Sequence, residues 1–214
     1  MLVMIKLDVF SDTICPWCYI GKKRLEKAIN NHKDLEIKQT WRPFQLNPGM
    51  PPDGMDRQEY LISKFGSSDA AKTIYDNIYD EGLKEGINFN FDSIQTTPNS
   101  FNSHRLLALA YEKGTQENVL SNLFESYFLN GEDIGDPNIL LDIAIKHQID
   151  AENFKSYLSD QENIEPLANE EIQAKKMGIS SIPTFIINKQ IVVNGAQTSK
   201  NFELIFEKLK ARIN

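Results

Sequence analysis

The chain contains two cysteines, Cys15 and Cys18, and only Pro16 and Trp17 separate them. Residues three positions apart on a helix lie one above the other, so a disulfide between them opens and closes with little backbone movement. Proline suits the first turn of a helix, which puts Cys15 at the amino end, where unpaired N–H groups favour a thiolate. The spacing therefore predicts thiol–disulfide exchange, in which Cys15 attacks and Cys18, one turn further and on the core side, resolves the mixed disulfide.

Three other roles for the cysteine pair are weaker. A structural zinc site needs four ligands, but the chain has no third cysteine, and His32, His104 and His147 show no paired spacing. A pair of inert core cysteines and a bridge that only braces the surface stay open, although so short a loop gains little from a bridge. We expect no metal and no tightly bound cofactor, with the Cys15–Cys18 disulfide as the redox group.

Composition and charge limit the possible partners. The 214 residues are 41% hydrophobic, which is enough for a folded domain with its own core, and the net charge is −7. Nucleic-acid binding needs a basic surface, and the nearest candidate, Lys22, Lys23, Arg24 and Lys27, is more simply explained as the solvated face of a helix. No segment approaches the ~20 apolar residues that span a bilayer, and charges interrupt the run from Met1 to Asp8 before it could act as a signal core. The sequence predicts a cytoplasmic protein that binds neither nucleic acid nor membrane.

The two ends of the chain carry the elements that would position the cysteines. Residues 3–10 predict a buried strand before the cysteine helix, and residues 35–41 predict a second strand, which implies a parallel pair. Residues 184–187 and 191–193 predict a hairpin closed at Asn188-Lys189. The apolar face of a final helix follows: Phe202, Ile205, Phe206, Leu209 and Ile213. Together these ends predict a thioredoxin-like α/β fold.

The region between the two ends has a helical pattern. Three apolar faces recur at helical spacing, with Asp136-Pro137 as a helix start. The faces are Leu120, Leu123, Phe124, Tyr127 and Phe128; Ile139, Leu140, Ile143 and Ala144; and Ile164, Leu167, Ala168 and Ile172. We predict that residues 1–49 and 178–214 form a discontinuous thioredoxin-like domain and that residues 50–177 form a helical insertion.

Four segments, in this order, resemble a known family, the DsbA-like thioredoxin-fold oxidoreductases, and specifically their cytoplasmic FrnE type. The segments are Asp12-Thr13-Ile14-Cys15-Pro16-Trp17-Cys18-Tyr19-Ile20-Gly21, Trp41-Arg42-Pro43-Phe44-Gln45-Leu46-Asn47-Pro48, Asn99-Ser100-Phe101-Asn102-Ser103-His104-Arg105-Leu106 and Ser181-Ile182-Pro183-Thr184. The same fold includes 2-hydroxychromene-2-carboxylate isomerases and kappa-class glutathione transferases, in which the position matching Cys15 looks like serine. The presence of both cysteines here favours dithiol exchange.

The resemblance implies a thioredoxin fold interrupted by a helical domain, with a cis Pro183 beside the nucleophile Cys15. The backbone from Ile182 to Thr184 would pair with an extended substrate segment. Pro16, Trp17 and the insertion would line the substrate cleft.

Two further polar pairs each have two alternative roles. His104 and Arg105 are candidate substrate-binding residues, but a polar pair at a helix start that faces solvent or binds a carboxylate explains them as well. Asp8 and Asp12 are close enough in sequence to assist proton transfer to Cys18, but we expect them at the surface.

The function predicted from these observations is that of a thiol–disulfide oxidoreductase or isomerase acting on protein or small thiol and disulfide substrates, with glutathione as a candidate co-substrate. The alternative is a glutathione-dependent transferase or isomerase on the same fold. A third candidate is a binding or chaperone-like module that uses an apolar cleft.

Overall fold

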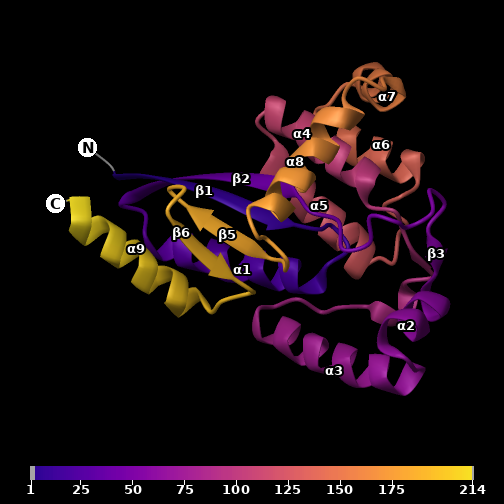
Figure 1. Ribbon diagram of the computed structural model, residues 1–214, viewed down its shortest axis with the longest axis horizontal. Coiled ribbons are helices and arrows are strands. Elements are labelled where there is room, and N and C mark those ends of the chain that lie inside the picture. Colours follow the sequence, from indigo (N-terminus) through magenta and orange to yellow (C-terminus); the bar gives the residue numbers. More distant parts are fainter. Residues whose placement is uncertain (1–2, 214) are drawn as a thin grey trace.

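A four-stranded sheet in the order β2-β1-β5-β6 forms the centre of one half of the molecule (Figure 1). The computed structural model describes residues 3–213. β1 pairs in parallel with β2 and antiparallel with β5, and β5 pairs antiparallel with β6. The strands are β1 (Val3–Ser11), β2 (Leu35–Pro43), β5 (Thr184–Ile187) and β6 (Ile191–Asn194). The predicted parallel pair and the predicted hairpin are both confirmed.

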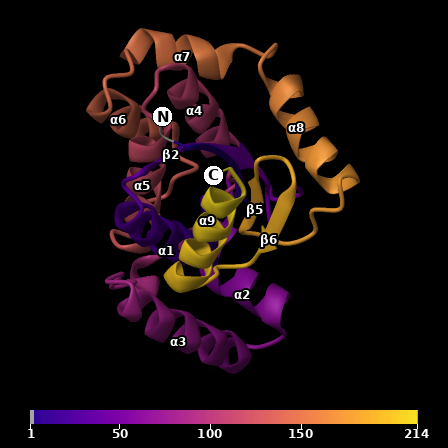
Figure 2. The same ribbon diagram turned by 90° about the vertical axis from the view of Figure 1, so that its left-hand side faces the viewer.

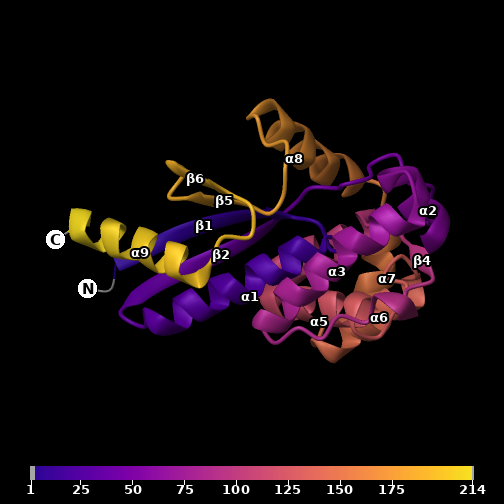
Figure 3. The same cartoon turned by 90° about the horizontal axis from the view of Figure 1, so that it is seen from below.

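Two helices cover one face of this sheet, and a third packs on the other. α1 (Pro16–Asn31) and α9 (Ser199–Ile213) lie side by side on the first face (Figure 2). α8 (Ile164–Lys176) lies on the opposite side and contacts β2 (Figure 3). Phe202 and Phe206 of α9 are fully buried, as its apolar pattern predicts, whereas the side chain of Ile213 lies outside the described residues.

The alternation of β1 explains why both faces are covered. Successive side chains of a strand point to opposite faces, and Ile5, Leu7 and Val9 all belong to the main core. Phe10, the next residue, packs instead in a small second core with Phe44, Ala174 and Ile179. The carboxyl end of β1, which leads into α1, is therefore buried on both faces, whereas Met4 and Lys6 near its start are exposed on the face of Phe10.

Most of the remaining helices form the insertion between β2 and β5. They are α2 (Arg57–Phe65), α3 (Ser68–Lys84), α4 (Phe101–Glu112), α5 (Gln116–Phe128), α6 (Pro137–Lys146) and α7 (Ala151–Ser159), followed by α8. The predicted apolar face of α5 is confirmed, since its five residues are all fully buried. Val9, Cys18 and Phe124 share one continuous core, so the insertion packs directly against the sheet half. The exact division of residues between the two parts stays a prediction.

Two expectations about the insertion need correction. A short two-stranded sheet, β3 (Met55–Asp56) with β4 (Thr96–Thr97), lies within the region predicted as helical. In α8 the predicted face is wrong at Ile172, which is 46% exposed; the helix is rotated so that Leu167, Glu171 and Ala174 are the buried residues.

The solvated face predicted for the basic residues of α1 is confirmed at Lys27, which is exposed, but it is wrong at Lys22 and Arg24. Lys22 is only 1% exposed, and its ammonium forms ion pairs with Glu26 and with Glu117 of α5. Arg24 is also buried and forms ion pairs with two acidic residues, Glu81 of α3 and Glu85. These contacts tie α1 to the insertion on two sides. None of the helices within residues 3–213 has the length and apolar character needed to cross a membrane.

The turn after α5 generates a stability prediction. Gly131 and Gly114 both have left-handed backbone angles, with φ of 72° and 73°, so alanine at either position carries a strain of ~1–2 kcal/mol. A Cβ at Gly131 would also lie 2.5 Å from the Ser93 carbonyl oxygen, whereas one at Gly114 would have no neighbour within 4 Å. We expect Gly131→Ala to lower the free energy of unfolding by ~1–3 kcal/mol more than Gly114→Ala, measured by chemical denaturation. Equal losses would show that the turn relaxes around the new methyl group.

Candidate active site

The start of α1 presents the two cysteines. Cys15 is the N-cap residue, Pro16 occupies the first turn, and the Cys15 carbonyl accepts hydrogen bonds from the N–H groups of Cys18 (3.0 Å) and Tyr19 (3.3 Å). The Cys15 N–H in turn donates to the carbonyl of Asp12 at 3.1 Å. The geometry predicted for the pair at a helix amino end is confirmed.

The two sulfurs lie in different environments. Cys18 is fully buried and Cys15 is 5% exposed, so Cys15 is the more accessible of the two. Burial raises the pKa of the Cys18 thiol well above its ordinary value, and the neighbouring Cys15 side chain adds to this shift. Cys18 is therefore protonated at neutral pH while the protein is reduced.

Asp12 is the centre of a buried polar network below the cysteine loop. It is fully buried, so the expected surface position is wrong. Its Oδ2 accepts a hydrogen bond from the N–H of Leu46 at 2.7 Å, and its Oδ1 lies 3.3 Å from His104 Nε2. Because Asp12 is one residue beyond β1, Leu46 follows β2 and His104 belongs to α4, one carboxylate connects three separate segments.

Neighbouring hydrogen bonds strengthen the same junction. The Thr13 and Ser103 hydroxyls lie 2.6 Å apart, and Ser103 donates to the Ser100 carbonyl at 2.7 Å. The Phe44 N–H donates to the Ser11 carbonyl at 3.2 Å. The first three of the four segments that carry the family resemblance thus meet around the cysteine loop.

The fourth segment contains the predicted cis bond, between Ile182 and Pro183. Pro183 is buried against α1, because a Cβ added to Gly21 would lie 3.1 Å from its ring. Thr184 is fully buried, and its hydroxyl contacts the Ser181 carbonyl (2.7 Å) and Asn194 Oδ1 (2.9 Å). Both residues are held firmly beside the helix that carries the cysteines.

The remaining predicted site residues occupy different positions. Pro16 is buried and Trp17 is 36% exposed beside Cys15. His104 is buried between Asp12 and a cavity of about 530 Å³. The Arg105 guanidinium donates to the carbonyls of Tyr157 in α7 and of Asp160 just after it, both at 2.8 Å, and so joins α4 to the end of α7. Substrate binding by these residues stays a prediction.

Residues 3–213 contain no cluster of three or more histidine, cysteine, aspartate or glutamate side chains that could hold a metal ion. The Asp12–His104 pair is the nearest approach to one at the active site, and its carboxylate oxygens are already occupied by Leu46 and His104. The sequence did not indicate that Leu46 and Ser103 help to fix the cysteine loop. Leu46 donates its N–H to Asp12, and the Ser103 hydroxyl contacts that of Thr13, so both contacts join segments far apart in the chain.

A mixed sheet followed directly by a helix with a dithiol at its amino end defines a thioredoxin-fold protein with a helical insertion. The model of the DSBA-like thioredoxin domain matches residues 6–207, and the chain belongs to this family.

Individual relatives agree with this assignment. The chain is 27% identical to the uncharacterized protein YwbO of Bacillus subtilis (strain 168) over 197 residues, which cover 90% of this chain and 91% of that protein. The crystal structure of a probable DsbA oxidoreductase from Streptomyces coelicolor superposes with a TM-score of 0.85 at 28% identity, covering 95% of this chain and 89% of the other. The structure of the cytosolic disulfide reductase DsbM from Pseudomonas aeruginosa with GSH is similar in fold, with a TM-score of 0.67 at 15% identity and coverage of 96% and 99%.

The buried state of Cys18 predicts a pH dependence of stability. In the unfolded chain Cys18 ionises near its ordinary pKa of ~8.5, whereas the folded thiol keeps its proton to a higher pH. Above pH ~8.5 the unfolded state binds fewer protons, so the free energy of unfolding of the reduced protein falls as the pH rises. We expect this fall to exceed that of Cys18→Ala by up to ~1.4 kcal/mol per pH unit, measured by urea denaturation with reductant present. Parallel curves for the two proteins would contradict this interpretation of Cys18.

The hydrogen bonds of Asp12 predict that Asp12→Asn destabilises the protein more than Asp8→Asn does. Asparagine offers one acceptor oxygen where Asp12 uses two, so Asp12→Asn presents an NH2 donor either to the Leu46 N–H, which loses its acceptor, or to His104, which must then change its tautomer and exchanges a bond to a carboxylate for a weaker bond to an amide. We expect a loss of ~1–3 kcal/mol in the free energy of unfolding. Asp8→Asn is the matched control, because Asp8 pairs with Arg42 in a partly exposed position, and such a pair contributes ~1 kcal/mol or less. Similar losses for the two variants would argue against a special role for the buried carboxylate.

Proposed function

We propose that the protein is a thiol–disulfide oxidoreductase that exchanges disulfides with protein or small thiol substrates through Cys15 and Cys18. The observation that carries this proposal is the unequal pair at the start of α1, with one cysteine at the N-cap and the other fully buried one turn later. An inert core pair needs no N-cap position, and that position favours an attacking thiolate.

The proposed reaction has two exchange steps. The Cys15 thiolate attacks one sulfur of a substrate disulfide, the substrate S–S bond breaks, and one substrate thiolate leaves. Cys18 then attacks the Cys15 sulfur, which forms the Cys15–Cys18 disulfide and breaks the bond to the substrate. The Cys18 proton passes to the departing substrate sulfur, and the thiolate released in the first step takes up a proton from solvent. The substrate disulfide is reduced to two thiols while the protein dithiol is oxidised, and the reverse sequence oxidises a dithiol substrate.

The loop before β5 supports substrate binding in an extended conformation. Within the described part of the chain, neither the N–H nor the carbonyl of Ile182 has a hydrogen-bond partner, although Ile182 is half-buried. An extended substrate segment would satisfy both groups as a short added strand. Trp17, partly exposed beside Cys15, would cover the other side of such a segment.

Glutathione is the small thiol that we propose as a co-substrate, and the likeness in fold to a disulfide reductase solved with GSH supports this choice. A cytoplasmic location and membership of the FrnE type belong to the same proposal. A glutathione-dependent isomerase would keep its activity after both cysteines are replaced, which separates it from the proposed oxidoreductase.

Single cysteine variants test the two roles. Cys15→Ser should reduce the rate of disulfide reduction to that without protein, because Cys18 is fully buried and cannot meet a substrate. Cys18→Ser should instead accumulate a mixed disulfide at Cys15, because the resolving thiol is missing. Mass spectrometry after reaction with glutathione disulfide measures the adduct, and the double variant is the control. If Cys15→Ser traps as much adduct as Cys18→Ser, the two roles are reversed.

A further inference from the structure

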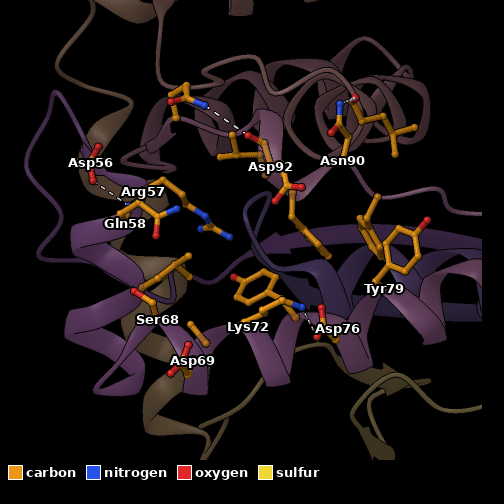
Figure 4. A pocket seen from close by; sticks show the side chains of 18 of the residues that line it. Asp56, Arg57, Gln58, Ser68, Asp69, Lys72, Asp76, Tyr79, Asn90 and Asp92 are labelled. Carbon is orange, nitrogen blue, oxygen red and sulfur yellow. Dashed lines mark hydrogen bonds and ion pairs between the residues drawn. The ribbon is translucent and has the colours of Figure 1, made fainter.

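A second feature beside α1 has no role in the exchange steps described above. A cavity of about 1030 Å³ lies between α2, α3 and the segment that leads through the short helix η1 (Phe91–Ser93) (Figure 4). Its walls include the aromatic side chains of Tyr75, Tyr79, Phe89 and Phe91. Arg57, the first residue of α2, points into the cavity.

Arg57 is a buried cation without a neighbouring anion. It is 5% exposed, and its Nη1 donates to two neutral oxygens, Thr97 Oγ1 at 3.1 Å and the Tyr127 hydroxyl at 3.5 Å. The Tyr75 ring faces the guanidinium at 4.9 Å. Within residues 3–213 no carboxylate lies within 4.0 Å of the guanidinium, whereas Lys22 and Arg24, the buried cations of α1, each have one. Arg105 of α4 also lacks a carboxylate, but its guanidinium donates to two backbone carbonyls.

The surrounding tyrosines do not neutralise this charge. Burial raises the pKa of the Tyr127 phenol, and burial likewise raises that of Tyr75 despite the nearby guanidinium. Both phenols are therefore neutral at physiological pH. Because a buried charge without a counter-ion is unfavourable, a guanidinium in this state beside an open cavity is suited to bind an anion from outside.

One wall of the cavity packs against α1 one turn after Cys15, at Tyr19, whose N–H donates to the Cys15 carbonyl at 3.3 Å. Phe89 of its wall packs edge-to-face against Tyr19 of α1, with ring centroids 6.0 Å apart. The Arg24–Glu81 ion pair holds α3, which carries Tyr75, along α1.

The acidic residues around the cavity restrict the charge of the anion. Asp56 caps α2 and Asp76 pairs with Lys72 at 2.7 Å, so these two carboxylates have their own partners. Asp69 and Asp92 also line the cavity and would repel a multiply charged group such as a phosphate. A single carboxylate, bound by the fork of the guanidinium, fits these charges best.

We propose that Arg57 binds a carboxylate of the disulfide substrate whose sulfur reacts with Cys15, while the aromatic wall packs against the apolar part of that substrate. The substrates are then acidic thiols and disulfides, such as glutathione or a peptide with a nearby carboxylate. This inference rests on the proposed oxidoreductase function and adds the class of substrate.

Two measurements test the site separately from the reaction. The first is binding of glutathione disulfide, by calorimetry, to the Cys15→Ser/Cys18→Ser protein, which cannot exchange disulfides. Adding Arg57→Gln should weaken binding at least tenfold, and Arg57→Lys should have a smaller effect because it keeps the charge but loses the fork. Lys84→Gln is the matched control: it also removes one positive charge from this half of the molecule, but Lys84 is exposed and lies outside the cavity wall, so binding should not change.

The second measurement compares two substrates in the protein with both cysteines. Arg57→Gln should raise KM for glutathione disulfide at least tenfold and leave turnover of bis(2-hydroxyethyl) disulfide, which has no carboxylate, nearly unchanged. The comparison within one variant cancels any fraction of protein that unfolds. Equal losses for both disulfides, or unchanged binding in Arg57→Gln, would overturn the carboxylate site.

The two proposals fail in different ways. Binding that depends on Arg57 in a protein that turns over neither disulfide would keep the site and reject the oxidoreductase function. Active turnover of both disulfides, with no effect of Arg57→Gln on either, would keep the function and reject the site.

Discussion

The buried carboxylate of Asp12 is the interaction on which the active site depends. It lies where the central strand becomes the cysteine loop, and it joins that loop to the segment after β2 and to α4 of the insertion. A carboxylate at this depth is stable only if its oxygens are satisfied, so the three segments must keep one arrangement. The position of Cys15 relative to the insertion follows from that arrangement, because the Asp12 carbonyl also accepts the Cys15 N–H.

Buried charges on α1 also need partners, and the insertion provides them. Lys22 and Arg24 of α1 are buried, and each finds a carboxylate on an inserted element. A helix that carried these charges in an isolated thioredoxin-like domain would expose them to water. The insertion therefore provides polar partners as well as apolar cover, and it adds an aromatic wall next to the start of α1. The contacts that hold the insertion against α1 therefore also place the cavity wall beside that helix.

Sequence patterns predicted the elements that depend on neighbouring residues. The strand before Cys15, the hairpin at Asn188-Lys189 and the apolar face of α5 follow from local periodicity, and the structure confirms them. The burial of Asp12 and Lys22 depends instead on partners 34 to 95 positions away in the chain, namely Leu46, His104 and Glu117, and no local sequence pattern indicates such partners. Polar residues were assigned to the surface by their type, and the errors fell where a distant partner makes burial favourable.

The topology of the sheet has a consequence for how the protein is made. The cysteines are synthesised directly after β1, but one neighbour of that strand, β5, is synthesised only after the whole insertion. At ~5–20 residues per second, the nascent chain carries its dithiol for on the order of ten seconds or more before the sheet can close around it. During that interval the thiols belong to a strand that is paired on one side only, and cellular oxidants meet them without the loop that contains Pro183. Correct maturation thus requires that the reactive pair survive translation of the whole insertion in its reduced form or be restored afterwards.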